Sequence, residues 1–294
     1  MEHLRVIEEP EGTATHLITA FKGWPDAGEG ASSAVRYLIR KLRARKVADL
    51  DPEEFFNFTE IRPTVSINSE GHRIVKWPTN ELYYTPGEEG SPGLMFFLGI
   101  EPHLKWRTFC SSLLEGVQRW GVGTVVHVGA LLDAVPHTRE VRITGSSNNP
   151  DLKDKLESQN IVPSHYQGPT GIASAIMSAC IEQELGYATI WGHTPHYLQA
   201  APNYRVGYTL ISNLKGFLEF RLELDELRSA ARTFDDEVGK AVSRDSQIGS
   251  YVQRLEERYD EAAVLTATEM PKSEELVQEL EEFLKNQQRR EGGS

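Results

Sequence analysis

The chain has 294 residues, of which 39% are hydrophobic and 25% are charged, as is typical of a soluble globular protein. Its formal net charge of -12 at pH 7 argues against a nucleic-acid partner, because binding a polyanion requires a basic face that the sequence does not show. No apolar run approaches the roughly 20 residues that a membrane-spanning helix needs, so we expect no membrane span.

The first part of the chain predicts strands interrupted by two helices. A buried strand over 14–21 leads through the stretch FKGWPDAGEG into an amphipathic helix over 29–43, whose last turn takes up part of the basic run 40–46. A second helix is expected over 101–121, with Pro102 at its first position. The strands expected between these helices lie at 64–68, 72–77, 81–85 and 93–99.

The middle of the chain continues the alternation of strands and helices. Helices are expected after the turn-rich link 146–150, over 172–186 and over 208–220, and strands over 124–132, 140–145 and 187–193. Such alternation indicates an α/β protein with a mainly parallel central sheet flanked by helices.

The character of the chain changes near residue 223. The last 70 or so residues show no strand pattern, and amphipathic helices are expected over 246–259 and 271–287. We therefore divide the chain into an α/β core, 1–222, and an all-helical C-terminal extension, 223–294. Apolar side chains of the second helix, including Leu276, Leu280 and Phe283, are expected to pack on the core or on a neighbouring subunit.

The stretch FKGWPDAGEG, residues 21–30, lies at the carboxyl end of a strand, where open α/β sheets place their ligands. Trp24 and Pro25 occupy positions where a phosphate loop needs bare backbone N–H groups, so a phosphate loop is disfavoured. Asp26 is suited to cap the following helix, and Glu29 could complete a capping box. A structural turn is favoured over a ligand or partner surface, and both readings stay open.

Histidines supply the other candidates for chemistry. His127 lies in an apolar strand and is expected to be a core residue, whereas His137 follows Pro136 in a loop after a buried strand. His193 and His196 are separated by Pro195 and do not form a helical metal pair, so no metal site is expected. We find no complete nucleophilic constellation and expect no cofactor. Catalytic residues are therefore left unassigned.

Four blocks of the sequence together resemble the PAC2 family, which is named for proteasome assembly chaperone 2. They are FKGWPDAGEGASSAVRYLIRKL near the N-terminus, GALLDAVPHTREVRITG at 129–145, GPTGIASAIMSAC at 168–180, and HTPHYLQAAPNYRVGYTLI at 193–211. The resemblance covers roughly residues 14–220 and is greatest to bacterial members with a helical C-terminal extension.

The resemblance implies a core similar to the nucleoside phosphorylase and peptidyl hydrolase fold, and assembly into homo-oligomers such as trimers. Some members of the family assist proteasome assembly, and some archaeal members dock on the proteasome through a C-terminal hydrophobic-Tyr-X tail. This chain ends in EGGS, so docking by that route is not expected.

The leading functional hypothesis is a self-associating, non-enzymatic protein of chaperone or assembly type with a protein partner. The sequence has no apolar segment near its start and only two cysteines, which favours a cytoplasmic setting.

The alternative functional hypothesis is a small-molecule binder or enzyme acting on a nucleoside or phosphate-type ligand. Arg139 would hold a phosphate or carboxylate and His137 would move protons, in a pocket lined by Asp26, His137, Arg139, His193 and Asn203. An adaptor with acidic helices for a basic partner is a third, less favoured reading.

Overall fold

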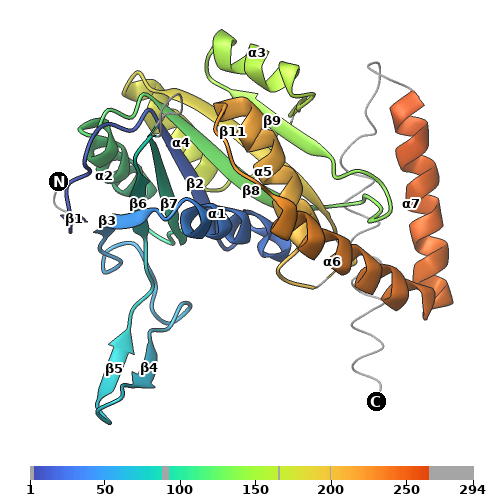
Figure 1. Ribbon diagram of the computed structural model, residues 1–294, viewed down its shortest axis with the longest axis horizontal. Helices are drawn as coiled ribbons and strands as arrows, with labels where there is room; N and C mark the ends of the chain where they lie inside the picture. The colour runs from blue at the N-terminus through green and yellow to red at the C-terminus, as the bar shows by residue number, and fades with distance from the viewer. Residues whose placement is uncertain (1–2, 88–92, 165, 199, 265–294) are drawn as a thin grey trace.

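The computed structural model describes residues 3–87, 93–164, 166–198 and 200–264, and its centre is a nine-stranded sheet (Figure 1). The strand order is β1-β3-β6-β7-β2-β8-β11-β9-β10. The strands are β1 (Leu4–Val6), β2 (His16–Lys22), β3 (Arg45–Leu50), β6 (Glu81–Thr85), β7 (Leu94–Ile100), β8 (Thr124–Asp133), β9 (Ile143–Ser147), β10 (Val162–Pro163) and β11 (Gly186–Pro195).

The sheet is mixed, so the expectation of a mainly parallel sheet is corrected. Its centre, β7-β2-β8-β11, is parallel throughout, but β1, β3 and β6 join it through antiparallel pairs, and β9 runs antiparallel to β11. The short connections explain the antiparallel strands. No helix lies between β6 and β7 or between β8 and β9, so the chain reverses direction there, whereas parallel neighbours require a longer crossover.

Helices cover both faces of the sheet, and the side chains of the central strands alternate between two cores. In β2, Leu17 and Phe21 point to one core and Ile18 and Ala20 to the other. Helices α2 (Trp106–Gln118) and α4 (Ile172–Glu182) pack on the first face. The second face is covered by α1 (Gly30–Lys41), α3 (Pro150–Ser158) and α5 (Tyr204–Leu218). Burial on both faces explains why these strands read as continuous apolar runs.

Several element boundaries differ from the sequence-based expectation. Helix α1 ends at Lys41, and the last two residues of the basic run, Arg45 and Lys46, begin β3, an element that the sequence analysis missed. Pro102 does not begin α2, which starts at Trp106. Helix α5 starts at Tyr204 because the Asn203 side chain accepts a hydrogen bond from the Val206 N–H, 3.1 Å away.

Two helices follow the core: α6 (Asp225–Ser243) and α7 (Ser246–Val264). Helix α6 packs on α5, and Leu227 belongs to the same apolar core as α1 and α5. The expected helix over 271–287, with Leu276, Leu280 and Phe283, lies outside the described residues. Within the part of the chain that the structure describes, no helix combines the length and apolarity needed to cross a membrane.

A two-stranded hairpin projects from the body, formed by β4 (Thr64–Ile67) and β5 (Arg73–Lys76) (Figure 1). Its strands pair only with each other, and neither joins the nine-stranded sheet. The hairpin therefore leaves both of its faces outside the two cores of the body.

Candidate functional site

Four of the five residues expected to bind a ligand line one cavity near the carboxyl ends of β8 and β11. They are His137, Arg139, His193 and Asn203, and helix α6 closes the cavity with Phe234 and Asp235. The cavity measures about 20 Å³, which is room for about one water molecule. Pockets for drug-sized ligands measure roughly 300–1,000 Å³, so this cavity does not accommodate a nucleoside as it stands.

Asp26, the fifth expected ligand residue, does not line this cavity. Its Oδ1 accepts hydrogen bonds from the N–H groups of Ala31 and Ser32, at 3.0 and 2.9 Å, and so caps α1. The cap reaches five and six residues along the chain because a 3₁₀ turn, Ala27–Glu29, separates Asp26 from the helix. Burial raises the pKa of Asp26 against the lowering effect of these hydrogen bonds.

The expected capping box does not form, because no side-chain bond from Glu29 closes it and Glu29 itself has a left-handed backbone. The loop is instead held by backbone bonds to other segments. The Ala130 N–H donates to the Pro25 carbonyl at 2.9 Å, and the Asn203 N–H donates to the Gly28 carbonyl at 2.8 Å. The FKGWPDAGEG stretch therefore contacts β8 and the start of α5, whereas the Asp26 carboxylate points to α1.

His193 lies between a carboxylate and a hydroxyl. Its Nδ1 is 2.7 Å from Asp133 Oδ2, and its Nε2 is 3.0 Å from Thr144 Oγ1. Burial alone would raise the pKa of Asp133, but the hydrogen bond and charge of His193 outweigh it and hold that pKa below its ordinary value. The three side chains join the end of β8 to β9 and β11.

This arrangement has the order of a carboxylate–imidazole–hydroxyl relay. Nucleophilic catalysis also needs a hydroxyl that substrate can reach. Thr144 and His193 are both buried, and the adjoining cavity holds only about one water molecule. In this conformation the relay ties strands together and is not open to a substrate.

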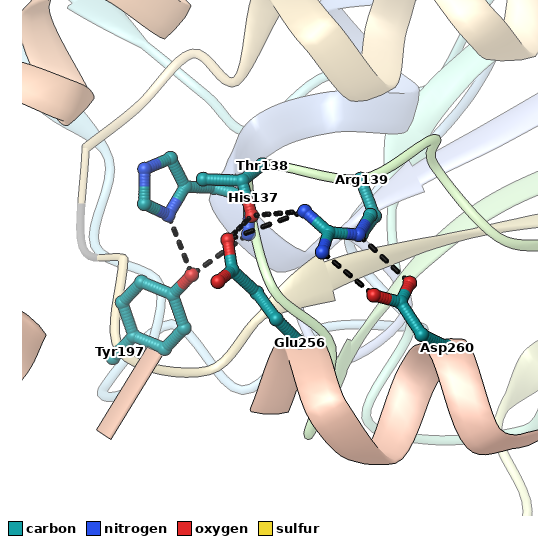
Figure 2. A network of polar contacts seen from close by, with 6 residues as sticks. All are labelled: His137, Thr138, Arg139, Tyr197, Glu256 and Asp260. Atoms are coloured by element: carbon teal, nitrogen blue, oxygen red, sulfur yellow. Dashed lines mark hydrogen bonds and ion pairs between the residues drawn. The ribbon is translucent and has the colours of Figure 1, made fainter. Parts of the chain in front are cut away.

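His137 is held by Tyr197, a residue that the sequence analysis did not single out. The Tyr197 hydroxyl accepts from the His137 backbone N–H at 2.8 Å and lies 2.7 Å from His137 Nδ1 (Figure 2). The hydroxyl also has a proton to donate, and a neutral His137 ring with its proton on Nε2 can accept that proton at Nδ1. Burial lowers the pKa of His137, which favours the neutral ring near neutral pH.

Arg139 is occupied by the chain's own C-terminal helix. Its guanidinium forms a two-point pair with Asp260 of α7, with Nε to Oδ1 at 2.8 Å and Nη2 to Oδ2 at 2.7 Å (Figure 2). Nη1 lies 3.3 Å from Glu256, which also accepts from the Thr138 hydroxyl. The bond from Arg139 holds the pKa of Asp260 below its ordinary value. The fork geometry expected for a phosphate or carboxylate ligand is thus present, and a helix carboxylate fills it.

Sequence reasoning missed the residues of α7 that complete this network. Glu256 and Asp260 are four residues apart and therefore share one face of the helix, which was the available signal. Tyr259 and Tyr251 add bonds from the same helix, to the Glu140 carbonyl and to His196 Nε2, both at 3.1 Å. In the described residues no group of three or more His, Cys, Asp or Glu side chains could hold a metal ion.

Comparisons with solved structures give close matches. A PAC2 family protein from Streptomyces avermitilis is 35% identical, with a TM-score of 0.74, and the match covers 81% of this chain and 99% of that one. A Mycobacterium tuberculosis proteasome-assembly chaperone homologue is 30% identical, with a TM-score of 0.73 and coverage of 81% and 100%.

A more distant neighbour shows the same fold. The archaeal proteasome activator PbaB of Pyrococcus furiosus is 18% identical, with a TM-score of 0.64, and the match covers 82% of this chain and 99% of that one. No curated protein matches the sequence. The PAC2 family model matches residues 20–242, a range that holds the FKGWPDAGEG loop, the 135–139 loop and α5, and the chain belongs to the PAC2 family.

Proposed function

We propose that this protein is a self-associating, non-enzymatic assembly factor of chaperone type, and that the β4–β5 hairpin is its main contact with other copies of the chain. One observation carries the proposal: the projecting hairpin has an apolar face that nothing in the chain's two cores covers. Val65 pairs with Val75 across the strands, and Ile67 follows two residues after Val65, so the three share a face. Their exposed fractions are 57%, 50% and 68%.

Such a hairpin needs a partner. An isolated two-stranded hairpin is only marginally stable in water, and exposed apolar patches mark interaction sites. Its charge favours a second copy as that partner. Residues 64–77 carry Arg73 and Lys76 against a single carboxylate, Glu70, whereas the whole chain has a net charge of -12. A weakly basic hairpin on an acidic protein is complementary to the body of another copy.

Two further observations support an assembly role over an enzymatic one. The cavity at the expected ligand residues is too small for a nucleoside, and Arg139 already binds Asp260. The Mycobacterium tuberculosis relative, at 30% identity, is described as a proteasome-assembly chaperone homologue. A protein client beyond the second copy is therefore part of the proposal. Cys110 and Cys180 are buried free thiols, which suits the reducing cytoplasm in which we place the protein.

Sedimentation equilibrium tests the proposal with a matched pair of variants. Val65→Lys places a charge on the apolar face, and Thr64→Lys places the same charge on the opposite face of the same strand. We expect the wild type and Thr64→Lys to sediment well above the monomer mass of 33.0 kDa, and Val65→Lys to shift toward the monomer. A wild type that stays monomeric at every concentration, or two variants that behave alike, would contradict the proposal.

A further inference from the structure

Apart from the cavity at His137, an open groove of about 490 Å³ lies beside the carboxyl ends of β2 and β7. Its volume lies within the roughly 300–1,000 Å³ usual for small-molecule pockets. Two tryptophans, Trp24 and Trp106, and two carboxylates, Glu60 and Glu101, are among its lining residues. The sequence analysis did not single out this combination, because the residues come from three separate segments.

Trp24 is 64% exposed, although it lies in the loop directly after a buried central strand. Its ring lies over Gly171, the residue before α4. A Cβ at Gly171 would be 3.0 Å from the Trp24 ring and 2.7 Å from Glu101 Oε1, so a side chain there would push the ring or the carboxylate away. Exposing a tryptophan in this way loses apolar burial and is typical of a binding surface.

Glu101 is fixed from two sides. Its backbone N–H donates to the Lys22 carbonyl at 2.9 Å, which continues the pairing of β2 with β7. Its Oε1 accepts from the Ile172 N–H, the first residue of α4, at 2.8 Å. The carboxylate is therefore held next to the Trp24 ring by backbone contacts.

Glu60 brings a second carboxylate to the groove. Its Oε1 accepts from Asn57 Nδ2 at 2.9 Å, and its Oε2 lies 3.4 Å from His103 Nε2. His103 Nδ1 in turn accepts from the Asn57 N–H at 3.2 Å, so the neutral ring carries its proton on Nε2, toward Glu60. The lining thus presents two carboxylates and no lysine or arginine. The neighbouring Lys105 pairs with Glu54, 2.6 Å away.

We propose that this groove binds a guanidinium or alkylammonium group, from a free amine or from an arginine or lysine side chain of a protein partner. A cation is attracted by the face of an indole ring and by carboxylates, and the groove places both kinds of group around one space. Trp24 and Trp106 supply the rings, and Glu60 and Glu101 supply the charge. This site is separate from the hairpin and from the cavity at His137, and it does not depend on self-association.

Isothermal titration calorimetry of the full chain with butylguanidinium tests the site. Butylurea is the matched probe, because it has nearly the same shape and no charge. We expect binding of butylguanidinium and no measurable binding of butylurea. Glu60→Gln and Trp24→Leu should each weaken binding by about tenfold, the loss expected when a charge-assisted or cation–π contact is removed. The control Glu115→Gln, on the exposed face of α2, should bind as the wild type does.

Two peptides distinguish the sources of the cation. One carries a single arginine, and the other carries citrulline in its place. An arginine peptide that binds more tightly than butylguanidinium identifies a protein side chain as the ligand, whereas a peptide that binds more weakly identifies a free small cation. Equal binding of butylguanidinium and butylurea, binding unchanged in Glu60→Gln and Trp24→Leu, or no binding of any cationic probe would overturn the proposal.

Discussion

Arg139 and Asp260 form a two-point ion pair that joins the loop after β8 to the last described helix of the chain, with N–O distances of 2.8 and 2.7 Å (Figure 2). They are 121 positions apart in sequence. The residue best suited to hold an external anion is therefore engaged within the chain. Any ligand for Arg139 has to displace the carboxylates of α7.

We expect Arg139→Ala to loosen α7. The substitution removes the fork that binds Asp260 and leaves Glu256 with only the Thr138 hydroxyl from the 135–139 loop. Amide hydrogens of α7 should then exchange several-fold faster, while those of β2 and β8 stay protected. Arg139→Lys should give a partial effect, because an ammonium keeps the charge but not the two-point geometry. Hydrogen exchange followed by mass spectrometry measures both.

The control for this experiment is Glu257→Gln, an exposed position on α7 outside the network. High salt should also speed exchange in wild-type α7, because partly exposed ion pairs are screened. If Arg139→Ala leaves the protection of α7 unchanged, the network does not hold the helix.

We expect two substitutions of Asp26 to change the free energy of unfolding in different ways. Asp26→Ala should lower the free energy of unfolding by about 1 kcal/mol, because the Ala31 and Ser32 N–H groups lose their acceptor. Asp26→Asn keeps the Oδ1 acceptor and removes a buried charge, so at pH 7 it should be as stable as the wild type or more stable. Urea denaturation followed by circular dichroism gives both values.

The pH dependence of the Asp26→Asn difference follows from the raised pKa of Asp26. Below the ordinary value of 3.8, the carboxyl is protonated in both the folded and the unfolded states, so the two proteins should differ little. As the pH rises from 3.8 through the folded pKa, burial opposes ionisation and the wild type loses stability relative to Asn. If the stability advantage of Asp26→Asn over the wild type shrinks as the pH rises, the fold stabilises the ionised carboxylate rather than the protonated one.

We expect His127 to make the protein sensitive to mild acid. The ring is fully buried beside the Phe21 and Trp191 side chains, and burial lowers its pKa from 6.5 to about 3. The stability that depends on the neutral ring is complete above pH 6.5 and is lost as the pH falls toward 3. Between pH 7 and pH 5 the free energy of unfolding should fall by about 2 kcal/mol from this group. His16, whose pKa burial lowers to about 4, acts in the same direction.

A matched measurement isolates the contribution of His127. The variant His127→Phe cannot titrate, and it keeps an aromatic ring beside Phe21 and Trp191. Its stability should change less between pH 7 and pH 5 than that of the wild type, whatever its absolute value. The same slope in both proteins would assign the acid sensitivity to other groups.

Ending the chain after residue 222 tests the proposed division into core and extension. Helix α6 packs on α5, and its buried side chains are Leu227, Ala231, Phe234 and Val238. Their removal should expose apolar surface of α5, lower the solubility and alter the oligomeric state. Light scattering after size exclusion measures the mass. An unchanged mass with undiminished solubility would show that 1–222 is independent of the extension.

Local pattern was enough to predict much of the fold. Continuous apolar runs identified the central strands β2, β7, β8 and β11, because residues buried on both faces leave a signal that does not depend on distant contacts. The short edge strand β1 and its neighbour β3 were missed. Arg45 and Lys46 belong to a basic run that is typical of the last turn of a helix. Their extended conformation depends on pairing with β6, which the local sequence does not reveal.

The sequence by itself determined the family, the parallel centre of the sheet, and the set of candidate residues near its carboxyl edge. The cap that Asp26 provides is local, and the sequence predicted it. Only the tertiary structure decided what His137 and Arg139 do: they bind Tyr197 and Asp260, which lie in segments whose place depends on long-range packing. In the FKGWPDAGEG stretch, Asp26 has the structural role expected of it, and the exposed Trp24 lines a groove. Spacing along a chain records which side chains share an element, but not which elements meet.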